Sequence, residues 1–493
     1  MADTKVSNLT NLAAPTRDDL LYIVNDPGGA PASYKTTVQD TIAGPSLLVA
    51  ASDAPADAIK NADYVCSGAD DQVQVQAAID ALPAGGGRVC LSSGTFLIQN
   101  LTETEVGLPL SGVVIHENHG DVELSGTLGT ILKQDAAQQA GSSMVLIRSI
   151  TNPRLARTKI AGFEVDGNIL NQPNIWLYAG PLTISNRSTV RTTGSILIED
   201  CYFHSWKDNG AAIYIGSYMR DIFISRNLFY TEWCPCVWTH DRRVNISNNI
   251  FRGLYNDASS YGVVLMTGDI GMGNSEYTVI TSNQFQGGFR AAVRLWGAQN
   301  CIVANNVIER IVNGGKAIWV NEYDDGAQLV HALGNLIANN VIYDCANGIW
   351  IEPDIGNLGI RHNRIVNNQI IEGPHVALDY GIYEVGANNL DNIIESNTIV
   401  GAATPIDATG SGVIVRNNYG YITENHGAAG AVADGGTIAH GCAATPTSAQ
   451  VTGSVANEFA SVTGIGAANL TVAIKKHDGT PGTAQTIYWR AWV

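Results

Sequence analysis

The chain has 493 residues, of which 45% are hydrophobic, and its 28 basic and 45 acidic side chains give a net charge of −17. The hydrophobic share excludes disorder of the whole chain, and the negative charge disfavours nucleic acid or an anionic membrane as partner, because polyanions repel each other. No run of about 18 apolar residues exists, so no membrane insertion is expected, and the first residues show no signal peptide.

Residues 1–50 are the first predicted unit. Strand-like segments at 19–25 and 34–38 flank a turn at 26–31, and 50 residues of this kind have little core of their own. The unit resembles the small N-terminal modules that attach phage tail fibres and tailspikes to the tail. The resemblance implies a phage tail or baseplate protein as partner. Residues 51–60, rich in Ala, Ser, Asp and Pro, predict a linker.

A helix is predicted at about 70–82. Val75, Ala78, Ile79 and Leu82 recur at helical spacing, and Pro83 and three glycines end the pattern. Alternating strands are expected at 88–91 and 94–98. The stretch from 63 to 98 resembles the N-terminal segment of pectate-lyase-type right-handed parallel β-helices. The resemblance implies that this helix caps the open end of a solenoid.

A repeated phrase in the middle of the chain predicts the same architecture independently. It consists of an apolar residue, two further residues, an asparagine, one residue and an apolar residue. Its asparagines stand 21 to 34 residues apart, at Asn227, Asn249, Asn283, Asn306, Asn340, Asn368, Asn397 and Asn418. A phrase with this period is typical of a solenoid whose turns bury their apolar positions by stacking. The amides should then form a ladder along the axis.

Residues 421–493 lack the phrase. Short strands at 436–440, 449–452, 459–462, 470–474 and 485–489 alternate with Gly, Asn, Asp and Pro turns. An all-β protein is therefore predicted, with a right-handed parallel β-helix at 61–420 between the N-terminal module and a C-terminal antiparallel β-sandwich-like module. The C-terminal module resembles modules of phage tail fibres, which implies a role in trimer assembly or glycan recognition.

A second aligned phrase predicts the binding face. Its apolar residues Ile213, Val237, Val293, Ile318, Ile349 and Ile382 should point inward. Period-two geometry then places a column of mostly aromatic side chains outward, about 4.8 Å apart. The column is Tyr214, Trp238, Arg294, Trp319, Trp350 and Tyr383, with Trp296 in the next outward position. An exposed aromatic ribbon of this kind would stack on sugar rings; a subunit interface is the alternative.

Two sets of side chains could carry catalysis. The first is acidic: Glu322, Asp324, Asp325, Glu352 and Asp354. Adjacent rungs could supply the two carboxyl groups that glycoside hydrolysis requires. These carboxylates could equally be solvated turn residues or a cation site.

The alternative set is His240, Arg242 and Arg294, beside Asp241. β-Elimination from a uronate needs a base and a cation that neutralises the carboxylate. The sequence from Val237 to Arg242 resembles the Asp-Pro-His phrase of alginate epimerases at His240, although Trp238 stands where that phrase has Asp. An ordinary surface histidine beside turn charges is the alternative. The cysteine spacing predicts no zinc site, and no cofactor is expected.

These features together resemble a phage tailspike or tail fibre. The resemblance implies a virion protein that acts outside the cell as a homotrimer, binds a host surface polysaccharide, and depolymerises it by hydrolysis or β-elimination. A non-enzymatic adhesin and a free secreted lyase or epimerase are the alternatives, since β-helices carry many functions.

Overall fold

The computed structural model describes residues 45–99, 111–136, 143–149, 157–168, 171, 180–186, 195–206, 211–216, 221–232, 234–254, 260–267, 275–312, 314–324, 329–353 and 359–493, with the backbone of two further strands. Those two strands, β1 (Leu20–Asn25) and β2 (Ala32–Thr37), pair antiparallel. The turn predicted between them lies outside the described residues. No helix in the described ranges has the length and apolar character that crossing a membrane requires.

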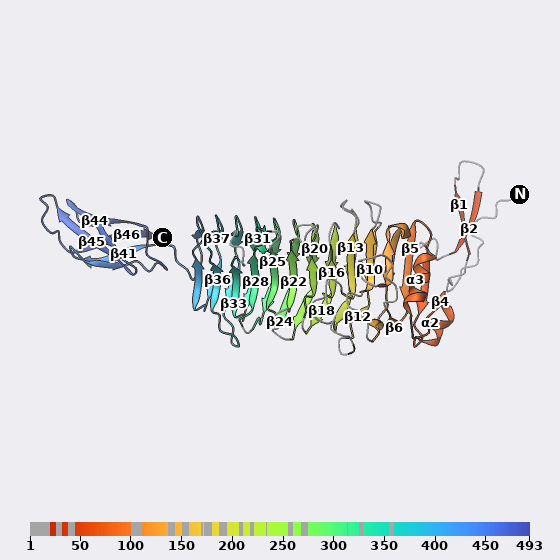
Figure 1. Ribbon diagram of the computed structural model, residues 1–493. Helices are drawn as coiled ribbons and strands as arrows, with labels where there is room; N and C mark the ends of the chain where they lie inside the picture. The colour runs from red at the N-terminus through yellow and green to blue at the C-terminus, as the bar shows by residue number, and fades with distance from the viewer. Residues whose placement is uncertain are drawn as a thin grey trace.

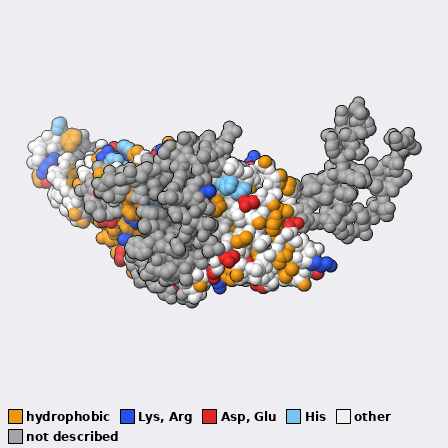
Figure 2. Space-filling model, turned by 45° about the vertical axis from the view of Figure 1, so that its right-hand side comes forward, with side chains coloured by type: hydrophobic (Ala, Val, Ile, Leu, Met, Phe, Trp, Pro, Cys, Tyr) orange, Lys and Arg blue, Asp and Glu red, His pale blue; other side chains and the backbone are white. Residues whose placement is uncertain are grey.

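Three long parallel sheets form the body of the described structure, and Figure 1 shows their strands stacked side by side along one axis. Each turn of the chain contributes a strand to each sheet, and most of these strands have three to six residues. This is the parallel β-helix that the repeated phrase predicts. In Figure 2, where the N-terminal end is turned forward, acidic, basic and hydrophobic side chains are mixed over the described surface of that end.

Sheet 1 has 14 described strands. They are β3 (Ser46–Ala50), β4 (Tyr64–Val65), β5 (Gly86–Leu91), β8 (Asp121–Ser125), β11 (Thr158–Ala161), β14 (Ile196–Glu199), β17 (Ile222–Ser225), β20 (Val244–Ser247), β23 (Val279–Thr281), β26 (Ile302–Ala304), β31 (Leu336–Ala338), β34 (Arg364–Val366), β37 (Ile393–Glu395) and β40 (Ile414–Arg416).

Sheet 2 has 11 described strands. They are β6 (Gly94–Ile98), β9 (Thr130–Gln134), β12 (Glu164–Asp166), β15 (Tyr202–His204), β18 (Leu228–Thr231), β21 (Ile250–Gly253), β24 (Gln284–Gly287), β27 (Val307–Glu309), β32 (Val341–Tyr343), β35 (Gln369–Ile371) and β38 (Thr398–Val400).

Sheet 3 also has 11 described strands. They are β7 (Ser111–His116), β10 (Ser143–Ser149), β13 (Leu182–Asn186), β16 (Ile213–Ile215), β19 (Val237–Thr239), β22 (Tyr261–Met266), β25 (Ala291–Trp296), β28 (Lys316–Asn321), β33 (Asn347–Ile351), β36 (Tyr380–Glu384) and β39 (Thr404–Ala408). A short antiparallel pair, β29 (Tyr323–Asp324) and β30 (Leu329–Val330), follows β28.

The N-terminal end of the solenoid carries the expected helix. Helix α3 (Gln72–Asp80) buries Val75, Ala78 and Ile79 against the core, and the 3₁₀ helix η2 (Glu117–His119) follows β7. The sequence placed residues 46–50 in the N-terminal unit and 51–60 in a linker. In the structure β3 pairs in register with β5 of sheet 1, and helix α2 covers Ala56–Asn61. The apolar run at Leu47–Val49 explains this, because β5 offers it a paired and buried position.

The asparagine ladder is present over its full length. The side chain of Asn227 accepts a hydrogen bond from the backbone N–H of Cys201. From Asn249 to Asn418, each ladder side chain accepts hydrogen bonds from the backbone N–H and the amide of the asparagine one turn earlier. The residue before each one has φ between 56° and 58°, and five of these residues are also asparagine. Asparagine tolerates this left-handed conformation better than most side chains, which explains the Asn-Asn pairs in the sequence.

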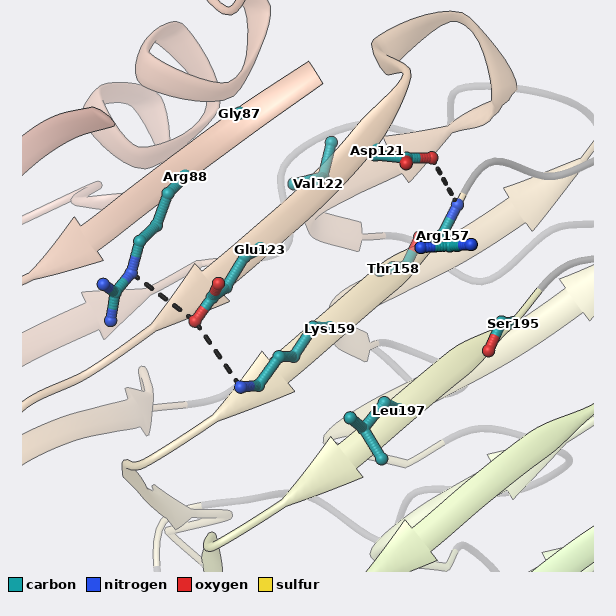
Figure 3. A pocket seen from close by; sticks show the side chains of 10 residues that line it. All are labelled: Gly87, Arg88, Asp121, Val122, Glu123, Arg157, Thr158, Lys159, Ser195 and Leu197. Atoms are coloured by element: carbon teal, nitrogen blue, oxygen red, sulfur yellow. Dashed lines mark hydrogen bonds and ion pairs between the residues drawn. The ribbon is translucent and has the colours of Figure 1, made fainter. Parts of the chain in front are cut away.

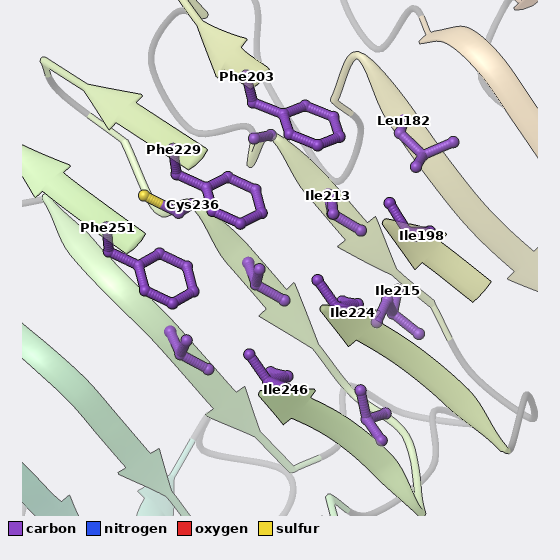
Figure 4. Packing of buried hydrophobic residues seen from close by; sticks show 14 of the residues in the cluster. Leu182, Ile198, Phe203, Ile213, Ile215, Ile224, Phe229, Cys236, Ile246 and Phe251 are labelled. Carbon is purple, nitrogen blue, oxygen red and sulfur yellow. The ribbon is translucent and has the colours of Figure 1, made fainter. Parts of the chain in front are cut away.

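A second ladder runs through Asn335, Asn363 and Asn392 at the start of the sheet 1 strands, and the backbone N–H of Cys301 donates to its first amide. The interior holds a third repeated stack, in which Phe203, Phe229, Phe251 and Phe285 lie face to face with centroids 4.6–5.0 Å apart. Figure 4 shows three of these rings beside the inward isoleucines. Rungs in register therefore place identical side chains above one another throughout the core.

The C-terminal module is antiparallel, as predicted. Its two sheets have the strand orders β41-β46-β43 and β42-β45-β44. The strands are β41 (Glu424–Val432), β42 (Thr437–Ala439), β43 (Ser448–Gly453), β44 (Glu458–Ile465), β45 (Asn469–Lys476) and β46 (Gln485–Trp492). A separate small core between them includes Ile438, Val472, Ile474 and Ile487. Strand β41 was not predicted, because its Gly- and Ala-rich sequence has low strand propensity.

Candidate functional site on sheet 3

The outward column of sheet 3 has the register that the sequence predicts. Tyr214, Trp238, Val264, Arg294, Trp319, Trp350, Tyr383 and Asp407 are successive partners on neighbouring strands. Their inward neighbours Ile213, Val237, Val293 and Ile318 are fully buried. Val264 is a further member that the sequence alignment left out, and it separates Trp238 from Arg294.

The prediction of a continuous exposed ribbon is wrong. Tyr214 and Trp319 are only 4% and 9% exposed, and Val264 is buried. Trp238, Trp350, Tyr383 and Trp296 are half-buried. Rings about 4.8 Å apart contact one another and the neighbouring outward columns, so they remove each other's faces from water.

These contacts build a second apolar cluster outside the solenoid. Its buried part consists of Tyr261, Val264, Met266, Ala291, Trp319 and Tyr323, and Trp238, Trp296, Val330 and Trp350 pack against it. The buried indole N–H groups of Trp296 and Trp319 have no hydrogen-bond acceptor among the described residues. The outer face of sheet 3 is therefore an aromatic surface, and these two indole N–H groups are buried within it.

Three cations surround the Trp319 ring. The guanidinium carbons of Arg294 and Arg290 lie 4.2 and 5.2 Å from the ring centroid, and Lys316 Nζ lies 4.7 Å from it. Arg294 also lies 3.8 Å from the centroid of Trp296. Burial, then the charge of Arg290, lowers the pKa of Lys316 from its usual value, and the charge of Glu352 opposes this. Cation–π contacts thus offset part of the hydration free energy that these cations lose on burial.

Arg294 is fixed by neutral partners as well as by the rings. Its Nη1 donates to the Tyr261 hydroxyl at 3.1 Å, and its Nε donates to Asn321 Oδ1 at 3.2 Å. The side chain is 7% exposed. Its position within the cluster is therefore determined from several sides.

An accessible aromatic platform lies beside these cations. The rings of Trp350 and Tyr383 stack with centroids 3.9 Å apart, and the indole N–H of Trp350 donates to Glu352 Oε2 at 2.7 Å. Burial, then the charge of Glu352, raises the pKa of Tyr383. Half-buried rings and a half-buried carboxylate thus share one surface. We call Arg290, Arg294, Lys316, Trp319, Trp350, Glu352 and Tyr383 the aromatic–cation site.

The structure describes three of the five acidic candidates, Glu322, Asp324 and Glu352. Glu352 and Glu322 belong to neighbouring rungs, because the backbone N–H of Glu352 donates to the carbonyl of Val320. Glu322 is fully buried; its Oε2 accepts from the Gly359 N–H at 3.0 Å, and its Oε1 has no partner among the described residues. Asp324 is half-buried in β29. Asp325 and Asp354 lie outside the described residues.

The side chains of the alternative catalytic set, His240, Arg242 and Arg294, contact different partners. His240 is fully buried, with its ring centroid 5.7 Å from that of Tyr214. Arg242 forms an ion pair with Glu276 at 2.6 Å, whereas Arg294 is held by the aromatic cluster two rungs away. The two guanidinium groups are therefore directed to different partners.

Sheet 1 offers a contrasting surface. A hollow of about 360 Å³ there is lined by residues that include Arg88, Glu123 and Lys159 (Figure 3). Glu123 lies 3.4 Å from Arg88 and 3.7 Å from Lys159, and Lys159 lies 2.8 Å from Glu199. Opposite charges alternate along this surface. No three His, Cys, Asp or Glu side chains of the described ranges gather as potential metal ligands.

Sequence reasoning missed Arg290, Lys316, Tyr261 and Tyr380 as members of the sheet 3 surface. Tyr261, Lys316 and Tyr380 occupy one further outward column, as their register shows. Each stands three residues before a member of the outward column, and strict alternation assigns this odd offset to the inside of the sheet, so the aligned phrase did not find them.

The comparisons with known proteins bear on the fold. Residues 182–325 and 237–419 match the family model of the right handed beta helix region. No curated protein matches the chain. Similar solved structures include the Pseudomonas phage phi297 tailspike, with 12% identity, a TM-score of 0.45 and coverage of 84% of this chain and 91% of that one.

Two further similar structures carry the names of enzymes. The Family 28 exopolygalacturonase of Yersinia enterocolitica has 14% identity, a TM-score of 0.47 and coverage of 78% and 80%. The mannuronan C-5 epimerase A-module of Azotobacter vinelandii has 18% identity, a TM-score of 0.44 and coverage of 71% and 96%. The three parallel sheets in register, together with the family-model match, show that the chain has the fold of a right-handed parallel β-helix followed by a C-terminal antiparallel module.

Proposed function

We propose that the protein is a phage tailspike-like receptor-binding protein, and that the outer face of sheet 3 binds a host cell-surface polysaccharide. One observation carries the proposal: Trp319, Trp350 and Tyr383 are consecutive partners on the outside of a solenoid, and the last two form a stacked, half-buried platform. Pyranose rings have apolar faces that stack on aromatic side chains, and a repeating glycan matches a repeating surface.

The remaining parts of the chain would serve this role. The segment before β3, residues 1–45, would attach the protein to a phage tail or baseplate protein, and residues 421–493 would support homotrimer assembly or glycan recognition. The protein would then act outside the cell as part of the virion.

The binding proposal is tested with Trp350→Ala and a matched control, Phe223→Ala. Phe223 is an exposed aromatic residue of sheet 1, 41% exposed. Loss of a stacking platform costs about 1–3 kcal/mol where bases stack on aromatic side chains, so Trp350→Ala should weaken glycan binding about fivefold to about a hundredfold. Phe223→Ala should bind as the wild type. Equal binding by all three proteins would contradict the proposal.

We further propose that the polysaccharide is depolymerised, with Glu352 as a catalytic carboxylate and Glu322 as its partner. Neighbouring rungs can supply the carboxyl spacing of about 5–5.5 Å for retaining or about 6.5–9.5 Å for inverting hydrolysis. Glu352 borders the aromatic platform through its bond to Trp350. β-Elimination with Arg294 neutralising a uronate carboxylate is the alternative chemistry.

Glu352→Gln tests this step, with Glu309→Gln on the outside of sheet 2 as control. Glu352→Gln should abolish product formation and retain glycan binding, while the control should keep both. New reducing ends identify hydrolysis, and unsaturated products that absorb ultraviolet light identify elimination. Binding without either product supports a non-enzymatic adhesin. That alternative has its own support, because Glu352 and Glu322 already accept structural hydrogen bonds.

A further inference from the structure

A hydrogen-bonded chain of serine, histidine and glutamate lies on the outer face of sheet 2, separate from the aromatic–cation site of sheet 3. His204 Nε2 lies 2.9 Å from Glu164 Oε1, and His204 Nδ1 lies 2.9 Å from Ser205 Oγ. An ionised carboxylate only accepts hydrogen bonds, so Nε2 of the neutral imidazole carries the proton and Nδ1 accepts from the serine hydroxyl. A hydroxyl bonded to a base that a third group orients is the signature of an activated nucleophile.

The register of two neighbouring rungs assembles this chain. The middle residues of β12 and β15, Val165 and Phe203, pair with each other and are buried in the core. Alternation along a strand then turns their flanking residues outward, and these include Glu164 of β12 and His204 of β15. The Tyr202 ring packs on the imidazole, with ring centroids 4.8 Å apart. The imidazole is therefore oriented by a carboxylate of one rung and by a phenol ring of its own strand.

These groups are accessible from solvent and lie beside a hollow. The side chains of His204 and Glu164 are 18% and 35% exposed, and Ser205 is half-buried. Glu164 and Tyr202 also line a hollow of about 490 Å³ at the turn between sheets 1 and 2, a size within the range of about 300–1,000 Å³ that is typical of small-molecule sites. A molecule bound at Ser205 would extend across the Tyr202 ring towards this hollow.

A second carboxylate lies near the imidazole. Asp166 Oδ1 lies 3.9 Å from His204 Nδ1, and Lys133 Nζ lies 3.5 Å from Asp166 Oδ2. An opposite charge at this distance favours the protonated imidazole, so a proton that the serine loses would be held more firmly on Nδ1. Lys133 partly neutralises Asp166 and thereby limits its repulsion of negative charge that develops on an attacked acyl group.

We propose that Ser205 is the nucleophile of a further catalytic site, which hydrolyses acyl esters of sugars, with His204 as its base and Glu164 as the group that orients the imidazole. Ser205 Oγ bonds to the ester carbonyl carbon while its proton passes to His204 Nδ1. The ester C–O bond then breaks, and the departing alcohol oxygen takes that proton and leaves an acyl-serine. Water gives a proton to Nδ1 and bonds to the acyl carbon, and the carboxylic acid departs as Ser205 Oγ takes the proton back.

The surroundings of Ser205 select the kind of ester. Its alcohol part would lie over the Tyr202 ring towards the hollow, and an aromatic ring stacks on the apolar face of a pyranose. An O-acylated sugar therefore fits this face of sheet 2. The proposed activity goes beyond glycan binding on sheet 3 and does not depend on it.

The first experiment asks whether Ser205 reacts as an activated serine in the full-length protein. After incubation with phenylmethylsulfonyl fluoride, mass spectrometry of the wild type should find one sulfonyl adduct, on Ser205. His204→Gln should lose the adduct, because a serine hydroxyl without a base is a weak nucleophile. Ser282→Ala is the matched control, since Ser282 is an exposed serine with φ of 57°, close to the 58° of Ser205, and this variant should react as the wild type does. An unmodified Ser205 in the folded wild type would overturn the inference.

The second experiment measures turnover with p-nitrophenyl acetate and with a sugar acetate, glucose pentaacetate. Ser205→Ala should lower kcat/KM by at least about a hundredfold for both esters, while Ser282→Ala should keep the wild-type value. Glu164→Gln should lower kcat for p-nitrophenyl acetate about tenfold to about a hundredfold with KM near the wild-type value, because Glu164 acts by positioning the imidazole. Thermal unfolding checks that every variant folds.

Equal kcat/KM of the wild type and Ser205→Ala would contradict the assignment, as would hydrolysis of p-nitrophenyl acetate without release of acetate from the sugar ester. Either result leaves glycan binding on sheet 3 as it stands, since Trp350→Ala tests that function separately.

Discussion

Removing one rung of the asparagine ladder should destabilise the solenoid strongly, and Asn368→Leu is the sharpest case. Asn368 is fully buried. Its amide donates to the carbonyl of Ile337 at 3.0 Å and to Asn397 Oδ1 at 2.9 Å. Its Oδ1 accepts from the backbone N–H of Asn340 at 3.0 Å and from the Asn340 amide at 2.9 Å. Leucine has the same branched arrangement of side-chain heavy atoms and makes none of these four bonds.

The size of the effect follows from the groups left behind. The backbone N–H of Asn340 loses the acceptor that the ladder provides, and the Ile337 carbonyl loses a donor. Each buried polar group without a partner costs about 1–3 kcal/mol, so the free energy of unfolding should fall by about 2–6 kcal/mol. Gln369→Ala is the matched control, because its side chain is exposed on the next residue of the chain. Such a surface change should stay within about 0.5 kcal/mol.

Urea unfolding followed by circular dichroism measures both variants against the wild type. Hydrogen exchange gives a local readout, in which the Asn340 amide of Asn368→Leu should lose protection before amides of distant rungs, because repeats contact mainly their neighbours. If Asn368→Leu unfolded at the same urea concentration as Gln369→Ala, the ladder would contribute no net stability and the reasoning would be refuted.

Two further predictions concern buried titratable groups. The carboxyl group of Asp344 is buried, but hydrogen bonds from the imidazole and backbone of His375 and from Val376 outweigh burial and lower its pKa. Its stabilisation is therefore present above the unfolded-state pKa and is lost as pH falls through the folded pKa. Asp344→Asn should be about 1.5–3 kcal/mol less stable than the wild type at pH 7, and urea unfolding at pH 3 should show a smaller difference; a constant difference would contradict the assignment. Burial raises the pKa of the Cys201, Cys301 and Cys345 thiols to about 12, so in the native protein they should react with Ellman's reagent only at the unfolding rate, and rapid reaction of these thiols would contradict their burial.

Much of the fold follows from the sequence because the solenoid repeats itself. The ladder asparagines were assigned from one recurring phrase, and the inward apolar residues and the outward column from a second. The ladder hydrogen bonds confirm the first set and the register of the sheet 3 strands confirms the second. A single period suffices here because each rung makes the same contacts as its neighbours. The ladder at Asn335, Asn363 and Asn392 escaped notice because it has fewer members, although it makes the same bonds.

The candidate site was less predictable, for physical reasons. A period of two assigns a side chain to the inside or the outside of a sheet, but it does not give the exposure of an outward ring. Trp319 is outward and nevertheless buried, because Tyr261, Tyr323 and their neighbours close over it. Arg290 and Lys316 escaped notice because their association with Trp319 depends on side-chain direction across rungs, which spacing along the chain does not encode.

The structure of the assembled protein in complex with an oligosaccharide of its polysaccharide ligand would be the most direct measurement. Sugar density is predicted over the Trp350 and Tyr383 rings, with Glu352 beside the glycan. Density on another surface, such as the C-terminal module, would contradict the role given to the outer face of sheet 3, as would burial of both rings beneath a neighbouring subunit.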